Sequence, residues 1–130
     1  MKKVFISVFV FLVSLTAFAA PVNIEIFFLP HRPAVAVVEK IEQALTGLDY
    51  ITIKKYSFDD KAAKKLIDKY NLHDHMPVAV FINGSDTHKA NGKDITFRNF
   101  PKGDAFVPSF EGVWSYSDIR HVAERIHGEK

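Results

Sequence analysis

The apolar positions of the chain predict four β-strands. Two of them, Val22–Phe28 and Val78–Ile82, are almost continuously apolar, which is typical of strands that are buried on both faces. Tyr50–Tyr56 alternates between apolar and polar residues, which suits the edge of a sheet. Asp94–Phe100 also alternates, so we expect a strand with one polar and one apolar face.

Three further segments have apolar residues three and four positions apart, which is the spacing of amphipathic helices. They are Ala34–Leu48, a helix that ends near Tyr70, and a last helix that ends just before Gly128. Ser57 and Asp60, which precede the second helix, have the spacing of a capping box. Ser115 and Asp118 have the same spacing before the last helix. The sequence therefore predicts where these two helices begin.

The order of these elements is β-α-β-α-β-β-α, which places the chain in the α/β class. A helix joins the first two strands, so we expect them to be parallel. The last two strands should form a hairpin, which gives a central mixed four-stranded sheet with helices on both faces. Asn83-Gly84 and Asn91-Gly92 both predict tight turns. The path between these turns stays open: it is either a long loop or an irregular extension of the hairpin.

The first nineteen residues have the features of a secretory signal peptide. Lys2 and Lys3 form a positive region, Val4–Val13 is an almost unbroken apolar run, and Ala17–Ala19 supplies the small residues of a cleavage site. The apolar run is shorter than the roughly 20 residues that span a bilayer, which argues against an uncleaved anchor. We therefore expect a signal peptide at 1–19, one domain at 20–130, and a periplasmic or secreted location.

The composition of the remaining 111 residues narrows the possible functions. They carry fifteen basic and fifteen acidic side chains, a balance that gives no indication of nucleic-acid or anionic-membrane binding. The chain has no cysteine, so neither a disulfide nor a thiolate nucleophile is available. An exported domain without disulfides depends on its hydrophobic core, and this length is enough to bury one.

Two short motifs resemble those of the thioredoxin-like fold. Phe27–Arg32 reads Phe-Phe-Leu-Pro-His-Arg, and it resembles the Phe-Phe-Cys-Pro-His-Cys segment of periplasmic disulfide oxidoreductases. Leu29 and Arg32 stand in the cysteine positions. Met76-Pro77 lies directly before the third strand, where thioredoxin-like proteins have a cis-proline. The resemblance implies a thioredoxin-like fold, a cis Met76–Pro77 bond and, because thiol-disulfide exchange needs sulfur, a redox-inactive protein.

The fold that this resemblance implies brings three loops together at one end: 29–33, 73–77 and 99–114. In relatives, the residue before the cis-proline offers its backbone to an extended peptide, and Met76 would take that role here. The resulting hypothesis is a groove that binds an extended peptide or a partner protein. Its candidate residues are Leu29, His31, Arg32, His75, Met76, Pro77, Phe100 and Trp114. The alternative is that Met76 and Pro77 only shape their loop.

The third loop is rich in aromatic residues whose spacing is not helical. They are Phe100, Phe106, Phe110 and Trp114. One interpretation is that they pin the loop to the core. The other is that they form an exposed apolar patch that lines the groove and contacts a partner.

Two other functional hypotheses remain open. His31, His73, His75 and Met76 are candidates for a copper or zinc site in a periplasmic metal-binding protein, since imidazole and thioether ligands suit these metals. No spacing matches a structural zinc motif. His31 and Arg32 at the start of a helix are also a candidate anion site. The third hypothesis is an enzyme with thiol-independent chemistry, for which the sequence indicates neither catalytic residues nor a cofactor.

Overall fold

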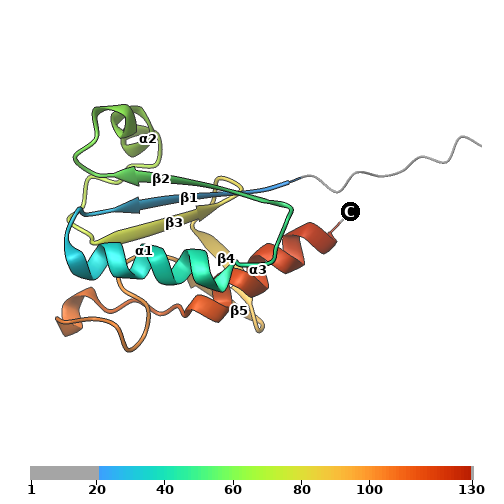
Figure 1. Cartoon of the computed structure of the whole chain (residues 1–130). Helices are drawn as coiled ribbons and strands as arrows, with labels where there is room; N and C mark the ends of the chain where they lie inside the picture. The colour runs from blue at the N-terminus through green and yellow to red at the C-terminus, as the bar shows by residue number, and fades with distance from the viewer. Residues whose placement is uncertain (1–20, 130) are drawn as a thin grey trace, which may run out of the picture.

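The first strand, β1 (Val22–Phe28), is the centre of a three-stranded sheet in the computed structural model, which describes residues 21–129 (Figure 1). β2 (Ile51–Ser57) pairs with β1 in parallel, and β3 (Val78–Ile82) pairs with its other side in antiparallel orientation. β1 and β3 have the predicted bounds. The parallel pairing of β1 with β2 and the position of β2 at the sheet edge are also confirmed.

Helices cover both faces of this sheet, as the sequence predicts (Figure 1). α1 (Arg32–Ala44) and α3 (Tyr116–Gly128) share a core with Val22, Ile24 and Ile26 of β1. The opposite face carries the short helix α2 (Lys64–Lys69) and the 3₁₀ turn before it, Lys61–Ala63. The side chains of β1 alternate between the two layers: Val22, Ile24 and Ile26 are buried on one face, while on the other Phe27 is buried, Glu25 half-buried and Asn23 exposed.

The buried centre of the α2 layer is the aromatic ring of Phe27. It stacks on Tyr56 with ring centroids 5.2 Å apart, and it meets Tyr70 and Phe81 edge-on at 6.0 and 5.8 Å. Offset and edge-on arrangements of this kind add to the stabilisation that burial alone supplies. Tyr70 also donates a 2.6 Å hydrogen bond to Glu25. Burial and that bond raise the pKa of Tyr70 to about 12, so its hydroxyl stays protonated at neutral pH.

Two Asn-Gly turns organise the chain after β3. Asn83 and Gly84, with φ values of 48° and 82°, lead from β3 into a second, two-stranded sheet. Asn91 and Gly92, at 53° and 77°, close that sheet. It consists of β4 (Thr87–Ala90) and β5 (Lys93–Thr96) in antiparallel pairing. The segment between the two turns is therefore a short strand, β4. The positive φ values of Asn91 and Gly92 are those of a two-residue hairpin turn.

The prediction of one four-stranded sheet is not confirmed, because the strand expected over Asp94–Phe100 divides. Its first part lies in β5 and pairs with β4. The following residues cross to β3 instead, where Arg98 and Ala79 form a single bridge pair. The Phe97 carbonyl accepts from Val80 N–H, and the N–H of Asn99 donates to Val78, both near 2.9 Å. Alternation along a strand fixes which side chains are buried but not which strand is the partner.

Only one of the two predicted capping boxes forms. The Ser115 hydroxyl accepts from Asp118 N–H and the Asp118 carboxylate accepts from Ser115 N–H, which closes the box at the start of α3. The Ser57–Asp60 box is wrong. Asp60 is itself the cap, accepting from Ala62 N–H at 3.0 Å, while the Ser57 hydroxyl accepts from Asp59 N–H. The 3₁₀ turn before α2 moves the helix start beyond the reach of Ser57.

The predicted signal peptide, residues 1–19, lies outside the described residues. Within residues 21–129, none of the helices has the length and apolar character that crossing a bilayer requires.

Removing the cap of α3 should measurably weaken the fold. Ser115→Ala deletes the hydroxyl that accepts from the backbone, and we expect the free energy of unfolding to fall by about 1 kcal/mol. Urea denaturation followed by Trp114 fluorescence measures this change. Ser109→Ala is the control, since its hydroxyl is exposed and makes no hydrogen bond within residues 21–129; it should change stability by less than about 0.5 kcal/mol. Equal stability of the two variants would contradict the role of Ser115.

Candidate functional site

Three loops meet at one end of the three-stranded sheet (left in Figure 1). Because β1 and β3 are antiparallel, the end of β1 lies beside the start of β3. A 2.9 Å hydrogen bond from Leu29 N–H to the Pro77 carbonyl joins the loop after β1 to the loop before β3. Asn99, which donates to Val78, brings in the third loop. The sheet thus gathers residues that are up to seventy positions apart in the sequence.

A small apolar hollow of about 160 Å³ lies between these loops. Its lining, which defines the apolar hollow, is Leu29, His31, Pro33, Ala34, His75, Pro77, Phe100 and Phe110. Five of the eight residues predicted for the groove are among them. The two imidazoles are the only polar side chains in this set, and both belong to exposed residues. The His75 ring meets the Phe110 ring edge-on at 5.9 Å.

The apolar hollow also contains residues that sequence reasoning assigned elsewhere. Ala34 is predicted only as part of its helix, and Pro33 only as the end of the loop 29–33 and not as a groove residue. Phe110 was one of four aromatic candidates without a distinguishing feature. The sequence did contain a signal for Pro33 and Ala34, because they directly follow the motif at the end of β1. The first turn of α1 therefore lies beside the same surface as the loop after β1.

The Met76–Pro77 bond is trans, so the predicted cis-proline is wrong; every peptide bond that the structure describes is trans. The prediction depended on resemblance alone, whereas trans is the ordinary state of about 95% of X-Pro bonds in folded proteins. Pro77 nevertheless lies against the loop after β1. Its carbonyl accepts the Leu29 hydrogen bond, and its ring lines the apolar hollow.

Met76 does not lie in the apolar hollow. The residue is 6% exposed, and it packs on the α2 side of the sheet with Phe27, Leu72 and Phe81. Residues alternate in direction along an extended segment, so the neighbours His75 and Pro77 face the hollow while Met76 faces the other core. The thioether is therefore a core side chain here.

Trp114 is also absent from the apolar hollow, because it is completely buried in the core beneath α1 and α3. Its indole N–H donates to the carbonyls of Arg98 and Asn99, at 3.1 and 3.3 Å. Its ring meets Phe97 and Tyr116 edge-on. Trp114 thus holds both ends of the 99–114 segment together, in agreement with the interpretation that aromatic residues pin this loop.

The other aromatic residues of this segment separate into two groups. Phe100 and Phe110 line the apolar hollow, and the backbone of Phe100 pairs with that of Phe110 at 2.9 Å. Phe106 is 80% exposed. Spacing in the sequence gives no way to tell these positions apart, since the segment is irregular.

The backbone of residues 73–76 makes no hydrogen bond within the described part of the chain. On one side of it lies the apolar hollow. On the other lies a second depression of about 290 Å³, the side hollow, which shares Leu29 and His75 with the first. The rest of the side hollow is lined by Phe58, Ile67, Leu72, His73, Asp74 and Met76. The two hollows share Leu29 and His75 and so lie next to each other at the end of the sheet; together with the backbone of residues 73–76 they are called the groove.

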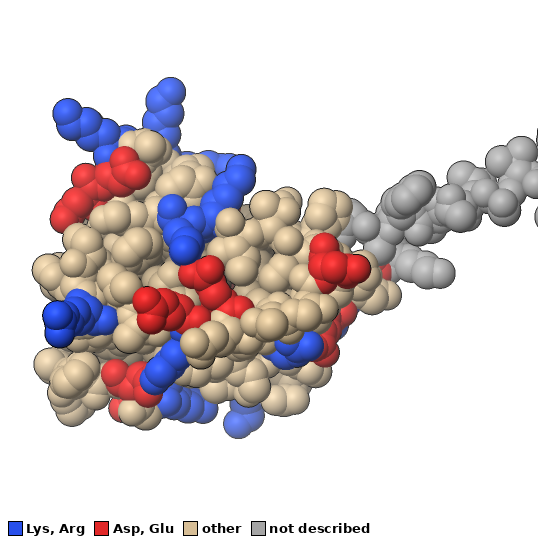
Figure 2. All heavy atoms as spheres, viewed as in Figure 1, with Lys and Arg blue, Asp and Glu red and all other residues tan. Residues whose placement is uncertain are grey.

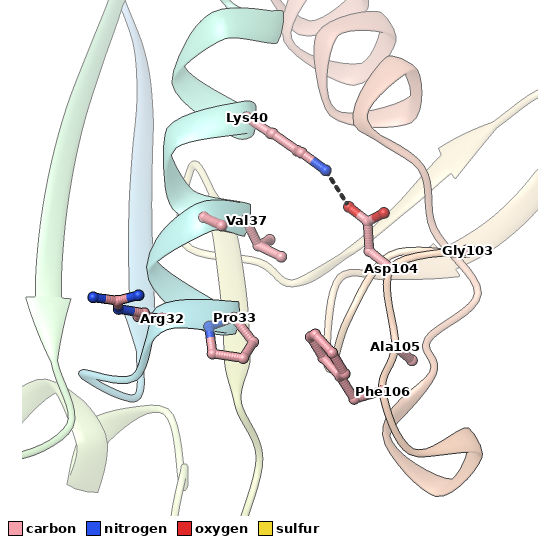
Figure 3. Close-up of a pocket in the computed structure, with 9 residues that line it drawn as sticks. Arg32, Pro33, Val37, Lys40, Gly103, Asp104, Ala105 and Phe106 are labelled. Carbon is pink, nitrogen blue, oxygen red and sulfur yellow. Dashed lines mark hydrogen bonds and ion pairs between the residues drawn. The ribbon is translucent and has the colours of Figure 1, made fainter.

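A larger but shallow depression of about 510 Å³ lies between α1 and the strap, residues 102–107 (Figure 3). Lys40 crosses it to pair with Asp104 at 3.1 Å, and Tyr116 donates a 2.6 Å hydrogen bond to the same carboxylate oxygen. The Tyr116 bond, and then Lys40, keep the pKa of Asp104 below its usual value against the effect of burial. These contacts hold the strap to α1, so we regard this depression as support for the groove and not as its centre.

The arrangement offers little to a metal ion. Residues 21–129 hold no group of three or more histidine, aspartate or glutamate side chains that could bind one. His73 lies 3.4 Å from Asp68, while His75 packs on Phe110. His73, His75 and Met76 all line the side hollow, whereas His31 lines the apolar hollow, so the proposed set of four is divided between the two.

Comparison with protein-family models, with curated proteins and with solved structures finds no match to this chain.

Loss of the Asp104 carboxylate should loosen the strap. Asp104→Asn removes the charge that Lys40 and Tyr116 recognise, and we expect the free energy of unfolding at pH 7 to fall by about 1 kcal/mol. Because the pKa of Asp104 is lower in the folded state, its carboxylate stabilises the fold at pH values above the unfolded-state pKa of about 3.9. This stabilisation is lost as the pH falls through the folded-state pKa. The difference between variant and wild type should therefore shrink on acidification below about pH 4.

Urea titrations of both proteins at several pH values measure this difference. Asp94→Asn, at an exposed position of β5, is the matched control and should lose less than about 0.5 kcal/mol at any pH. If the difference in the free energy of unfolding between wild type and Asp104→Asn stayed constant down to low pH, the stabilising role of the Asp104 carboxylate would be contradicted.

Proposed function

We propose that this chain is an exported, redox-inactive, thioredoxin-like protein that binds an extended peptide, or an extended segment of a partner protein, along the groove at the end of its sheet. The observation that carries this proposal is the apolar hollow beside an unpaired stretch of backbone. A small apolar site fixes one side chain, and free N–H and C=O groups bind a main chain of any sequence.

The size of the apolar hollow favours a single side chain as its occupant. Pockets for cofactors and drug-sized ligands usually measure roughly 300–1,000 Å³, and this one measures about 160 Å³. Its lining is almost wholly apolar. An aliphatic or aromatic side chain from a peptide would bury its surface there at about 25 cal/mol per Å².

The backbone at 73–76 favours a peptide over an isolated apolar ligand. Its N–H and C=O groups lack partners in the described structure, and pairing them with an extended strand would add hydrogen bonds next to the hollow. In the thioredoxin-like proteins that the sequence resembles, the backbone before the third strand has this role. The proposal keeps the role for residues 75 and 76 with a trans Pro77, because backbone groups do not depend on the missing sulfurs.

The lack of thiol chemistry follows from the sequence itself. Thiol-disulfide exchange requires a thiolate and a second sulfur, and the chain contains no cysteine. Leu29, at the position that resembles the first redox cysteine, lines the apolar hollow. The side chain that replaces the nucleophile therefore adds apolar contact surface.

Truncating a wall of the hollow should weaken peptide binding. Peptides selected from a random library against the mature protein are expected to share an apolar residue. Phe110→Ala should weaken their binding about fivefold or more, since it removes one apolar wall. Val113→Ala is the control because Val113 is 57% exposed and lies outside the hollow.

Fluorescence anisotropy gives the affinities, and amide chemical-shift mapping gives the location. Shifts clustered at residues 29–34, 73–77 and 110 are expected. A library that yields no binder, or a shift map centred elsewhere, would overturn the proposal.

The register of the resemblance can be tested separately. If Leu29 and Arg32 stand where thioredoxin-like proteins have redox cysteines, Leu29→Cys/Arg32→Cys should form an intramolecular disulfide. A disulfide needs Cα atoms about 4.4–6.8 Å apart, and two residues at the start of a helix can approach that closely. Thiol counting and mass spectrometry after mild oxidation detect it. In the control, Leu29→Cys/Val35→Cys, the second site lies about one turn further along α1 and should keep two free thiols. Two free thiols in the first variant would show that the register is shifted.

A further inference from the structure

Arg32 differs from the other arginines of residues 21–129 in having no partner. Arg98 pairs with Asp86, Arg120 with Glu124 and Arg125 with Glu129. The Arg32 side chain makes no ion pair or hydrogen bond within that range, and the residue is exposed. Figure 3 shows it pointing away from Asp104, the carboxylate that Lys40 and Tyr116 already occupy.

Arg32 lines the depression between α1 and the strap, and its two sequence neighbours line the adjacent apolar hollow. Arg32 follows His31 and precedes Pro33, and both of these residues line the apolar hollow. The lining contains no carboxylate. Figure 2 shows basic and acidic side chains on the same face of the molecule. The single acidic residue of the groove, Asp74, lines the side hollow.

We propose that the groove selects extended peptides in which an acidic residue lies within two positions of the apolar residue that fills the hollow. This inference rests on the proposed function and names the class of peptide. The carboxylate pairs with Arg32, and Asp74 disfavours a second acidic residue at the side hollow. Charge complementarity of this kind gives an interface its selectivity more than its affinity.

The reach of the groups agrees with this spacing. Consecutive Cα atoms are 3.8 Å apart, so Arg32 is one such step from a residue that lines the hollow. A peptide residue one or two steps from the anchored side chain covers a similar distance, and arginine has one of the longest side chains. Because the pair would be solvent-exposed, its effect should be modest, about two- to fivefold in affinity.

The test uses three fluorescein-labelled peptides that differ at one position. The parent is Ser-Gly-Asp-Phe-Gly-Ser, and the other two carry Asn or Lys in place of Asp. Wild-type mature protein should bind the Asp peptide about two- to fivefold more tightly than the Asn peptide, and the Lys peptide most weakly. Arg32→Glu should reverse this order, and Arg32→Gln should remove it. Added salt should reduce the preference in the wild type.

Lys89→Glu is the matched control, since it makes the same charge change at an exposed position of β4. It should keep the wild-type preference. Equal binding of the three peptides, with no effect of Arg32→Glu, would overturn the inference and leave peptide binding itself standing. A loss of preference in Lys89→Glu as well would also overturn it, since the overall charge would then be responsible. If none of the peptides binds, and library peptides fail too, the proposed function fails with it.

Discussion

Burial of Val22, Ile24 and Ile26 on one face of β1, and of Phe27 on the other, is the constraint on which the rest of the structure depends. These buried side chains need a layer on each side, and the chain supplies α1 with α3 on one face and α2 with an aromatic cluster on the other. The parallel crossover to β2 and the antiparallel return of β3 then follow from packing two more strands beside it. With that topology, the loop after β1 and the loop before β3 must meet at one end, which is where the groove lies.

Trp114 has a comparable part in the segment that closes the groove. Its buried indole is bonded to carbonyls sixteen and fifteen residues earlier, which turns an irregular stretch into a closed loop. Gly112 is needed beside it, because a side chain there would collide with the Arg98 carbonyl. The Gly112 N–H donates to Phe100 at 2.6 Å. Phe100 and Phe110 are thereby fixed as walls of the hollow, although neither contacts the sheet through regular pairing.

Sequence reasoning located what depends on local pattern. The bounds of β1 and β3, the two Asn-Gly turns and the Ser115 cap all follow from side-chain period or turn chemistry. It failed where the outcome depends on partners distant in sequence. The period of Asp94–Phe100 does not say that the chain changes partner at Phe97. Aromatic composition does not distinguish the buried Trp114 from the exposed Phe106, and the Ser57 pattern cannot show that a 3₁₀ turn precedes α2.

The candidate site shows the same division. Leu29, His31 and His75 come together because two neighbouring strands end there, which the order of elements already indicates. The cis Met76–Pro77 bond is the part of this prediction that is wrong. Met76 still lines the side hollow, although its side chain packs in the α2 core, and the backbone at 73–76 is unpaired within the described residues. Main-chain N–H and C=O groups are present whatever the side chain, so recognition through the backbone does not depend on the residue at this position. Leu29, which lines both hollows, adds apolar surface beside this backbone.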